Sequence, residues 1–284
     1  MSNAKYKVLL AGGALAALLC AGAVVAAAAP ADAPATAIPD FSSNSAAWQA
    51  PNGTDFIPVP GSPPPVTNDP KYPYVSNGEA NRTGKQPTFR IGDLSNPNLK
   101  QWAKDIMKKD NDEVVAGKIA FTPSSSCKQY GPTAYNLAGG PFFIIQTPKI
   151  VWMIQETERF ARRVYMDVPH SKNLKPSWYG ESVGHYEGDT LVIDTIDLNT
   201  QTFVDNFRTP HSEKLHVVER LRVVNEGKTL EVHMTIDDPE TYHQPWQVIR
   251  RFNRTEARMI EEICQEGNFM LFDYGIPVAE KPDF

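Results

Sequence analysis

Hydrophobic and polar residues alternate with a period of two over most of the chain after residue 140, and this alternation predicts β-strands. The runs are rich in Ile, Val, Phe and Trp, which favour strands, and short polar connections separate them. No helical segment of the kind that joins parallel strands lies between them, so antiparallel pairing is expected. The predicted strands are 142–147, 150–157, 160–167, 182–187, 190–197, 215–224, 229–237, 246–253 and 259–264.

Turn residues support hairpins between consecutive strands. Gly188-Asp189 is typical of a two-residue hairpin turn, and residues 225–228 form a second hairpin loop. We therefore predict a mainly β fold in which an antiparallel meander closes into a lipocalin-like barrel, because closure removes exposed strand edges. A β-sandwich is the alternative fold.

Helical periodicity is clear over residues 98–116, which predicts one helix that ends before Gly117. Residues 30–90 hold a dense series of prolines with Gly, Ser and Asn between them. Proline fixes φ and removes a hydrogen-bond donor, so this segment is predicted to be an extended arm or linker. Residues 91–284 are then a single β-rich domain.

The first residues have the pattern of a secretory signal peptide. Lys5 and Lys7 precede an apolar run over residues 8–29, which ends in Ala27-Ala28-Ala29. Small residues of this kind fit a cleavage site, so residues 1–29 are predicted to be removed and the protein to be periplasmic or secreted. An uncleaved membrane anchor is the alternative, because the run is long enough to span a bilayer. After cleavage no stable membrane insertion is expected.

Cysteine usage fits an exported protein. Removal of the leader takes away Cys20 and leaves Cys127 and Cys264. In an oxidising compartment these two are predicted to form a disulfide, with two separate buried thiols as the alternative.

Composition narrows the range of partners. The 284 residues are 41% hydrophobic and 21% charged, as in an ordinary globular protein with a full core. The net charge of −5 leaves no basic surplus to neutralise phosphates, so nucleic acid is not expected as a partner.

Three charged residues fall on apolar strand faces. Glu219 shares its face with Val217 and Leu221, Arg250 shares its face with Val248, and Asp194 lies between Val192 and Ile196. A lone buried charge is unstable, so Glu219 and Arg250 are predicted either to pair inside the barrel or to line a ligand cavity there. A barrel of about eight to ten strands has room for a small ligand.

The predicted hairpin at residue 188 also places His185 and Asp194 on one face as diagonal neighbours. A carboxylate beside an imidazole is a common acid–base arrangement. Leu191 and Ile193 on the opposite face compete to be the buried side.

Other candidate ligand contacts lie in loops and on strands. His170 and His211 lie in loops next to strands, where ligands often bind. Arg163, Arg250 and His211 are candidate anion binders, and Tyr186 and Trp246 are candidate aromatic contacts. No spacing matches a known metal motif, and the chain has no GxSxG elbow, phosphate-binding loop or CxxC pair, so neither metal nor cofactor is expected.

Several motifs occur together in a specific order over residues 97–268. They are Lys100-Gln101-Trp102-Ala103, Ser124–Cys127, Arg162–Asp167 running to Pro169-His170, Ser182–Thr195 (SVGHYEGDTLVIDT), Pro210-His211-Ser212-Glu213, Val218-Glu219-Arg220, Thr235–Pro239 and Pro245-Trp246. In these motifs the chain resembles a family of exported, largely uncharacterised bacterial proteins. The resemblance implies export and a single β-rich body, and it implies no particular reaction. The loop at residues 167–171 is shorter than is usual in the family and lacks its arginine.

The sequence therefore favours an exported barrel with a pocket for a small apolar or aromatic ligand. One hypothesis is a cofactor-independent isomerase, lyase or hydratase, with His185 as base, Asp194 orienting it and Glu219 as acid. The alternative is a non-catalytic binding or carrier protein with the same pocket. A surface or scaffold protein attached through its Pro-rich arm is a third hypothesis.

Overall fold

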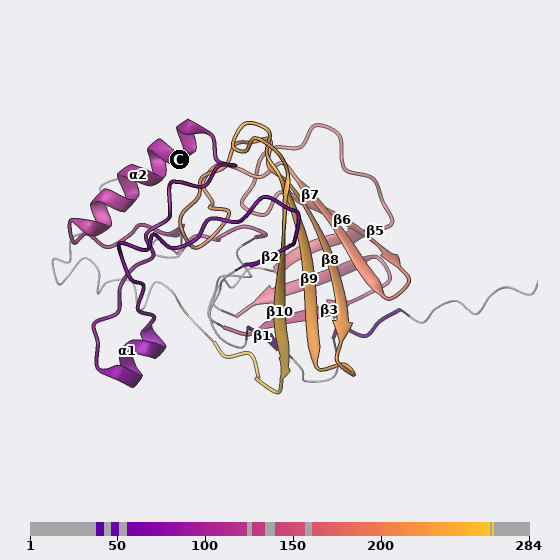
Figure 1. The fold of residues 1–284 in the computed structure, drawn as a ribbon. Helices are drawn as coiled ribbons and strands as arrows, with labels where there is room; N and C mark the ends of the chain where they lie inside the picture. The colour runs from indigo at the N-terminus through magenta and orange to yellow at the C-terminus, as the bar shows by residue number, and fades with distance from the viewer. Residues whose placement is uncertain are drawn as a thin grey trace, which may run out of the picture. The chain divides into compact units, whose positions relative to one another are not determined.

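The computed structural model describes residues 38–42, 47–50, 56–123, 127–133, 140–156, 161–261 and 263. The predicted signal peptide and Cys264 lie outside these residues, so cleavage and the disulfide stay predictions. Two helices and ten strands are described (Figure 1). They are β1 (Ala47–Gln49), β2 (Ile57–Pro58), α1 (Asn77–Thr83), α2 (Gln101–Val115), β3 (Phe142–Gln146), β4 (Ile150–Gln155), β5 (Ala161–Met166), β6 (Glu181–Glu187), β7 (Thr190–Ile196), β8 (His216–Val224), β9 (Thr229–Asp237) and β10 (Trp246–Thr255).

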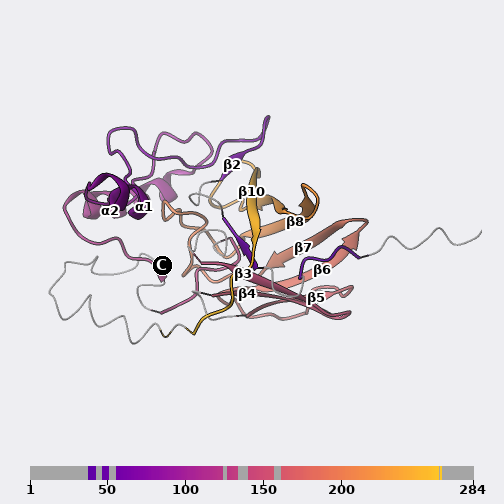
Figure 2. The same cartoon turned by 90° about the horizontal axis from the view of Figure 1, so that it is seen from below.

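The sheet closes into a barrel, as the alternation predicted. Neighbouring strands follow the order β1-β3-β4-β5-β6-β7-β8-β9-β10, and β1 also pairs with β10, so these nine strands form a ring. The two-residue strand β2 pairs with β10 beside the ring. Figure 2 shows β4 and β5 on one side of this barrel and β8 and β10 on the other.

The hairpin at Gly188 has the predicted register, with Glu187 opposite Thr190 and Val183 opposite Asp194. Gly188 adopts a φ of 61°, which suits the first central position of a tight hairpin turn. The second predicted hairpin, through residues 225–228, joins β8 to β9.

One pair departs from the antiparallel prediction, because β5 and β6 run parallel. Their connection, residues 167–180, has no helix and was not expected to be a crossover. It is longer than the dozen or so residues that a chain needs to return to the same end of a sheet. We call residues 167–180 the crossover loop.

The closing strand comes from the arm and not from the C-terminal segment. The predicted strand at 259–264 is wrong for residues 259–261 and 263, which the structure describes outside any strand. The place beside β10 is taken by β1, whose Trp48 is fully buried and donates its indole N–H to the Phe41 carbonyl at 2.9 Å. Local alternation could not identify so short a strand.

The arm contains two strands and a helix, although its composition predicted no regular structure. β1 lies between Pro39 and Pro51, and α1 lies between Pro73 and Pro87. β2 contains Pro58, which is tolerated because this strand pairs with β10 alone.

The predicted helix at 98–116 is confirmed as α2. Its start is held against the segment before β10, because the Lys100 N–H donates to the Thr241 carbonyl at 2.9 Å and the Trp102 indole to the Glu240 carbonyl at 2.7 Å. Neither helix in the described part of the chain is long and apolar enough to cross a membrane.

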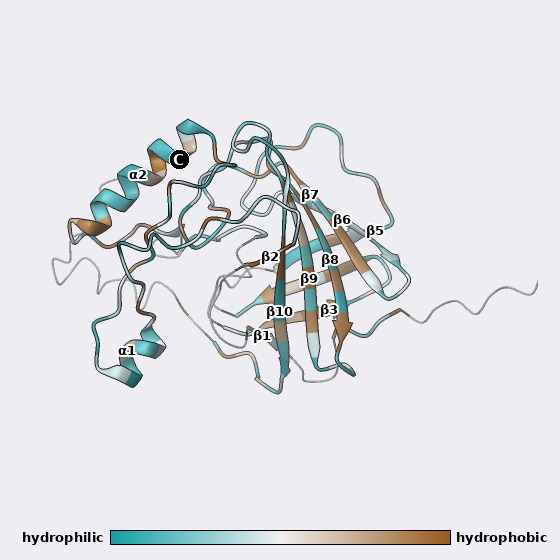
Figure 3. Ribbon diagram, viewed as in Figure 1, coloured by the Kyte–Doolittle hydropathy of each residue, from teal (hydrophilic) through white to brown (hydrophobic). Residues whose placement is uncertain are grey.

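The barrel core consists of inward side chains that alternate along each strand. Hydrophobic and hydrophilic positions alternate along β8, β9 and β10 in Figure 3. The predicted inward faces of β8 and β10 are confirmed, since Val217, Leu221 and Val248 are fully buried. On β7 the inward residues are Leu191 and Ile193, also fully buried. This decides which face of the β6–β7 hairpin is interior.

Candidate functional site

A charged network lies inside the barrel and joins four consecutive strands. Arg162 on β5 is inward with Val164 and Met166, because these three residues share the period of the strand. Its guanidinium donates to the Ser182 hydroxyl at 3.1 Å, to the Thr195 hydroxyl at 2.8 Å and to the Glu219 carboxylate. Arg162 is 2% exposed and Glu219 is fully buried. The positive charge is therefore neutralised inside the core.

The predicted interior position of Glu219 is correct, and its carboxylate contacts Arg162, a cation that the sequence did not indicate. The predicted pairing of Glu219 with Arg250 stays a prediction. Ser182 and Thr195 are small, and they leave room for the long Arg162 side chain to cross two strands to Glu219. Arg250 is also buried, as predicted, and its guanidinium lies 5.5 Å from the Phe252 ring.

The predicted His185–Asp194 dyad is wrong. Both residues are on the outer face of the barrel, because Leu191 and Ile193 occupy the interior. His185 Nε2 lies 3.0 Å from Glu187, and Arg220 donates to the same carboxylate at 2.5 Å. These hydrogen bonds, first that of Arg220 and then that of His185, lower the pKa of Glu187 to about 2.

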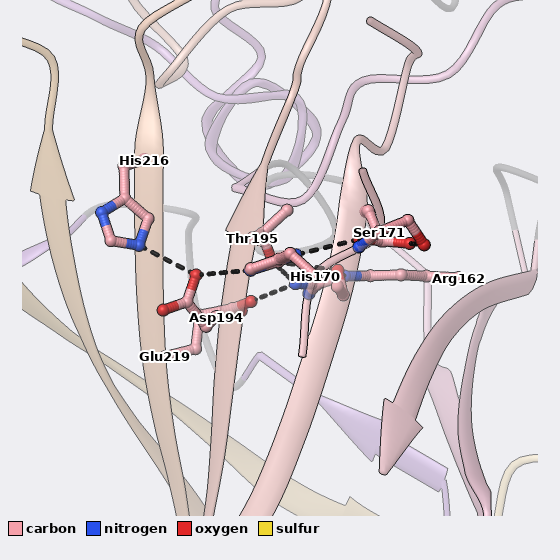
Figure 4. A network of polar contacts seen from close by, with 9 residues as sticks. Arg162, His170, Ser171, Asp194, Thr195, His216 and Glu219 are labelled. Carbon is pink, nitrogen blue, oxygen red and sulfur yellow. Dashed lines mark hydrogen bonds and ion pairs between the residues drawn. The ribbon is translucent and has the colours of Figure 1, made fainter. Parts of the chain in front are cut away.

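Asp194 instead joins two other histidines in an outer cluster (Figure 4). Its Oδ1 lies 2.9 Å from His216 Nε2 on β8 and 3.0 Å from His170 Nε2 in the crossover loop. The hydrogen bond with His216 lowers the pKa of Asp194 and raises the pKa of His216.

His170 extends the cluster to β6. Its Nδ1 lies 3.1 Å from Glu181, whose carboxylate also accepts the Ser171 N–H at 2.7 Å and the Ser171 hydroxyl at 2.6 Å. Burial would raise the pKa of Glu181, but the hydrogen bonds from Ser171 and His170 outweigh it and lower that pKa. We call His170, Ser171, Glu181, Asp194 and His216 the outer cluster.

The remaining predicted contacts are dispersed. The Tyr186 hydroxyl accepts from Gln146 Nε2 at 2.8 Å, and burial raises the pKa of Tyr186. Trp246 is buried, with its ring edge-on to those of Phe56 and Tyr242 at 5.9 and 5.4 Å. Neither residue shares a site with the outer cluster.

His211 is buried beside a hollow of about 520 Å³ that Trp102 and Glu240 also line. Its Nδ1 donates to the Ser212 carbonyl at 2.9 Å, and the Thr202 hydroxyl donates to its Nε2 at 2.7 Å. Burial lowers the pKa of His211, so the ring is neutral. Both of its nitrogens therefore serve the protein's own structure.

A different hollow, of about 430 Å³, lies where β5 and β6 run parallel. Its apolar wall is formed by Tyr165 and by three residues of the crossover loop, Leu174, Trp178 and Tyr179. Its polar wall includes Glu181 of the outer cluster. We call this hollow the seam pocket.

Two arginines of β5 line the seam pocket in different ways. Arg162 reaches it from the interior network, whereas Arg163 lies on the outer face with its guanidinium 5.4 Å from the Trp152 ring. Lys128 lies near the pocket wall, with its Nζ 5.6 Å from the centre of the Trp178 ring. Arg163 is thus the one predicted anion binder that lies on this pocket.

Tyr179 and Arg162 also border a small cavity inside the barrel. This cavity, which Phe142, Met153 and Gln155 complete, has a volume of about 10 Å³. Such a volume holds about one water molecule. Arg162 and Tyr179 therefore line both this small cavity and the seam pocket.

Gly180 fixes the end of the crossover loop. It has a φ of +58°, and a Cβ at this position would lie 2.1 Å from the Ile196 carbonyl oxygen. Only glycine fits so close an approach. The chain therefore turns directly from Trp178 and Tyr179 into β6.

Sequence reasoning missed Arg162, Trp178, Tyr179 and Glu181. Arg162 shares its period with Val164 and Met166, so the strand pattern did hold a signal for an inward arginine. The aromatic pair before Gly180 and β6 is a second signal. Glu181 had none, because its partners come from a loop with no regular pattern.

No family model, curated protein or solved structure matches this chain. The resemblance to exported bacterial proteins thus stays a prediction that rests on the motifs alone. Among the described residues, no group of three or more His, Cys, Asp or Glu side chains is arranged to hold a metal ion.

The interior pair predicts a clear pattern of stability changes. Glu219→Gln or Arg162→Met alone is expected to lower the free energy of unfolding by about 3–5 kcal/mol, because each removes one of two opposite charges that face each other in the interior. The double variant Arg162→Met/Glu219→Leu is expected to lose less than either single change. Urea unfolding of the three variants measures this. Asp189→Asn, in an exposed pair with Arg222, serves as the control and is expected to change little. Strictly additive losses would contradict the pairing.

The outer cluster predicts a pH dependence. The pKa of His216 is raised in the folded protein, so its contribution is full below its unfolded value near 6.5 and is lost as pH rises through the folded value. The unfolding free energy of the wild type relative to His216→Gln should thus fall between pH 5.5 and 8.5. Because both partners are about half exposed, the change should stay below about 1 kcal/mol. A difference that is constant or that rises with pH would contradict the assignment.

Proposed function

We propose that the protein binds a small aromatic molecule with an anionic group in the seam pocket. A volume of about 430 Å³ lies within the range of roughly 300–1,000 Å³ typical of small-molecule sites. Aromatic walls with a few placed polar groups are also typical of such sites. The observation that carries the proposal is the joint presence of Trp178, Tyr179 and Arg163 around one hollow.

The charges near the pocket favour an anion. Glu219 neutralises Arg162, and Glu181 already accepts hydrogen bonds from Ser171 and His170. Arg163 lies on the outer face, where its donors can meet a ligand, and it stacks on Trp152. A guanidinium binds a carboxylate well because two parallel N–H groups can donate to its two oxygens.

Binding without conversion is the function that this arrangement supports best. The three residues predicted to be catalytic are divided between the two sides of the barrel wall, since His185 and Asp194 are outside and Glu219 is inside. The acid that faces the pocket, Glu181, is held as a carboxylate by its lowered pKa. A general acid needs a proton to give at the working pH, so Glu181 does not suit that role.

One observation favours acid–base catalysis as the second candidate. Glu181 connects the seam pocket through His170 to Asp194 and His216, so a proton acceptor on the pocket wall is linked to a histidine whose pKa is raised by its carboxylate partner. Turnover of a bound ligand that Glu181→Gln abolishes without loss of affinity would support this candidate.

Calorimetric titration tests the binding proposal. Naphthalene-2-carboxylate is compared with naphthalene-2-methanol, which has the same rings and no charge, and indole-3-acetate and benzoate extend the set. The carboxylate is expected to bind at least about tenfold more tightly than the alcohol, since a charge-assisted hydrogen bond contributes about 1.5–3 kcal/mol. Arg163→Gln should remove this difference, and Trp178→Ala should weaken both ligands.

Two controls make this test specific to the seam pocket. Arg222→Gln removes an exposed arginine elsewhere, and Trp102→Ala changes the hollow beside His211. Both variants should bind like the wild type. The proposal fails if no aromatic carboxylate binds at millimolar concentration, if acid and alcohol bind equally, or if Trp102→Ala is the variant that weakens binding.

A further inference from the structure

The crossover loop is both a wall of the seam pocket and a segment held by polar contacts. Leu174, Trp178 and Tyr179 line the pocket from this loop. Its second half is fixed by backbone hydrogen bonds, from the Ser177 N–H to the Asp197 carbonyl at 3.0 Å and from the Asn199 N–H to the Ser177 carbonyl at 2.9 Å. Backbone bonds of this kind do not titrate.

The first half of the loop is held in a different way. His170 and Ser171 attach it to the barrel through the carboxylates of Glu181 on β6 and Asp194 on β7. Beyond these two residues, Lys172, Asn173 and Lys175 are exposed. The position of the pocket wall therefore depends on the side chains of the outer cluster.

The hydrogen bonds of His170 require a particular charge. Its Nδ1 faces a Glu181 oxygen at 3.1 Å, and its Nε2 faces an Asp194 oxygen at 3.0 Å. An ionised carboxylate only accepts hydrogen bonds, so both ring nitrogens must carry hydrogen for both bonds to form. A neutral imidazole carries only one N–H, so it can donate to Glu181 on β6 or to Asp194 on β7 but not to both.

We propose that His170 acts as an imidazolium tether, which holds the crossover loop against β6 and β7 while both ring nitrogens carry hydrogen and releases one of these strands when the imidazolium loses a proton. Whichever bond is lost, the bridge between Glu181 and Asp194 is broken. Ser171 still holds Glu181, and His216 still holds Asp194, since each keeps a donor when His170 is neutral. The strands stay in place, and the loop alone is loosened.

Four charged or titratable groups surround His170. Glu181 and Asp194 face it from β6 and β7. His216 on β8 shares Asp194 Oδ1 with it, and Asp237 at the end of β9 acts on His216. The pKa values of Glu181 and Asp194 are lowered, so both carboxylates remain ionised well below neutral pH. The tether therefore depends on the charge of His170 and not on that of its partners.

The consequence for the ligand rests on the proposed function. A loosened first half of the loop would present Leu174 less rigidly to the pocket, and the loss of a positive charge beside Glu181 would weaken the attraction for an anion. Both effects lower the affinity for an aromatic carboxylate as pH rises from 5.5 to 8.5.

Hydrogen–deuterium exchange of the full chain tests the tether without any ligand. Protection of residues 168–176, corrected for the intrinsic pH dependence of exchange, should fall about two- to fivefold between pH 5.5 and 8.5, as expected for one partly exposed ionic hydrogen bond. In His170→Gln the protection should be low at both pH values. His185→Gln, an exposed histidine paired with Glu187 on β6, is the matched control and should respond like the wild type. His216→Gln should keep the transition.

The outcomes separate the two proposals. The tether is overturned if wild-type protection does not change with pH, or if His170→Gln keeps the transition. Affinity for naphthalene-2-carboxylate, measured at the same two pH values, should fall in the wild type and stay level in His170→Gln. A loop transition with unchanged affinity would overturn the link to the pocket. If no aromatic carboxylate binds, the proposed function fails, and the exchange data still decide the tether.

Discussion

A guanidinium inside a barrel has to be neutralised where it lies, and Arg162 meets this requirement by reaching across two strands to Glu219. The small side chains of Ser182 and Thr195 leave room for Arg162 to pass, and their hydroxyls accept hydrogen bonds from its guanidinium. One side chain from β5 is thereby joined to β6, β7 and β8. A buried ion pair is weak evidence of extra stability, but it strongly penalises any register that separates its partners. This penalty therefore favours the observed register between the parallel strands β5 and β6.

The seam pocket lies where the parallel strands β5 and β6 pair. Because β5 and β6 run parallel, the chain must return to the same end of the sheet through the crossover loop. This loop places Trp178 and Tyr179 directly before the first residue of β6, where they line the seam pocket. Tyr179 lines both the seam pocket and the small cavity inside the barrel. The parallel pair, the buried charge and the pocket are thus parts of one arrangement.

Regular alternation made the barrel strands from β3 to β10 and the inward positions of Glu219 and Arg250 predictable, because period two assigns faces directly. It could not find β1, which is three residues long and buried through Trp48. The pairing of Glu219 with Arg162 was also beyond a local pattern, since it depends on which strands become neighbours. The His185–Asp194 dyad failed because two apolar residues, Leu191 and Ile193, compete for the same interior.

The most direct test of an aromatic-anion site is a titration of ¹⁵N-labelled protein with naphthalene-2-carboxylate, followed through its five tryptophan indole N–H signals. Binding in the seam pocket predicts that the Trp178 signal shifts most, together with the Arg163 Nε–H signal, while Trp48 and Trp246 in the core remain unchanged. A largest shift at Trp102, beside the other hollow, or no indole shift at saturating ligand would contradict the proposed site.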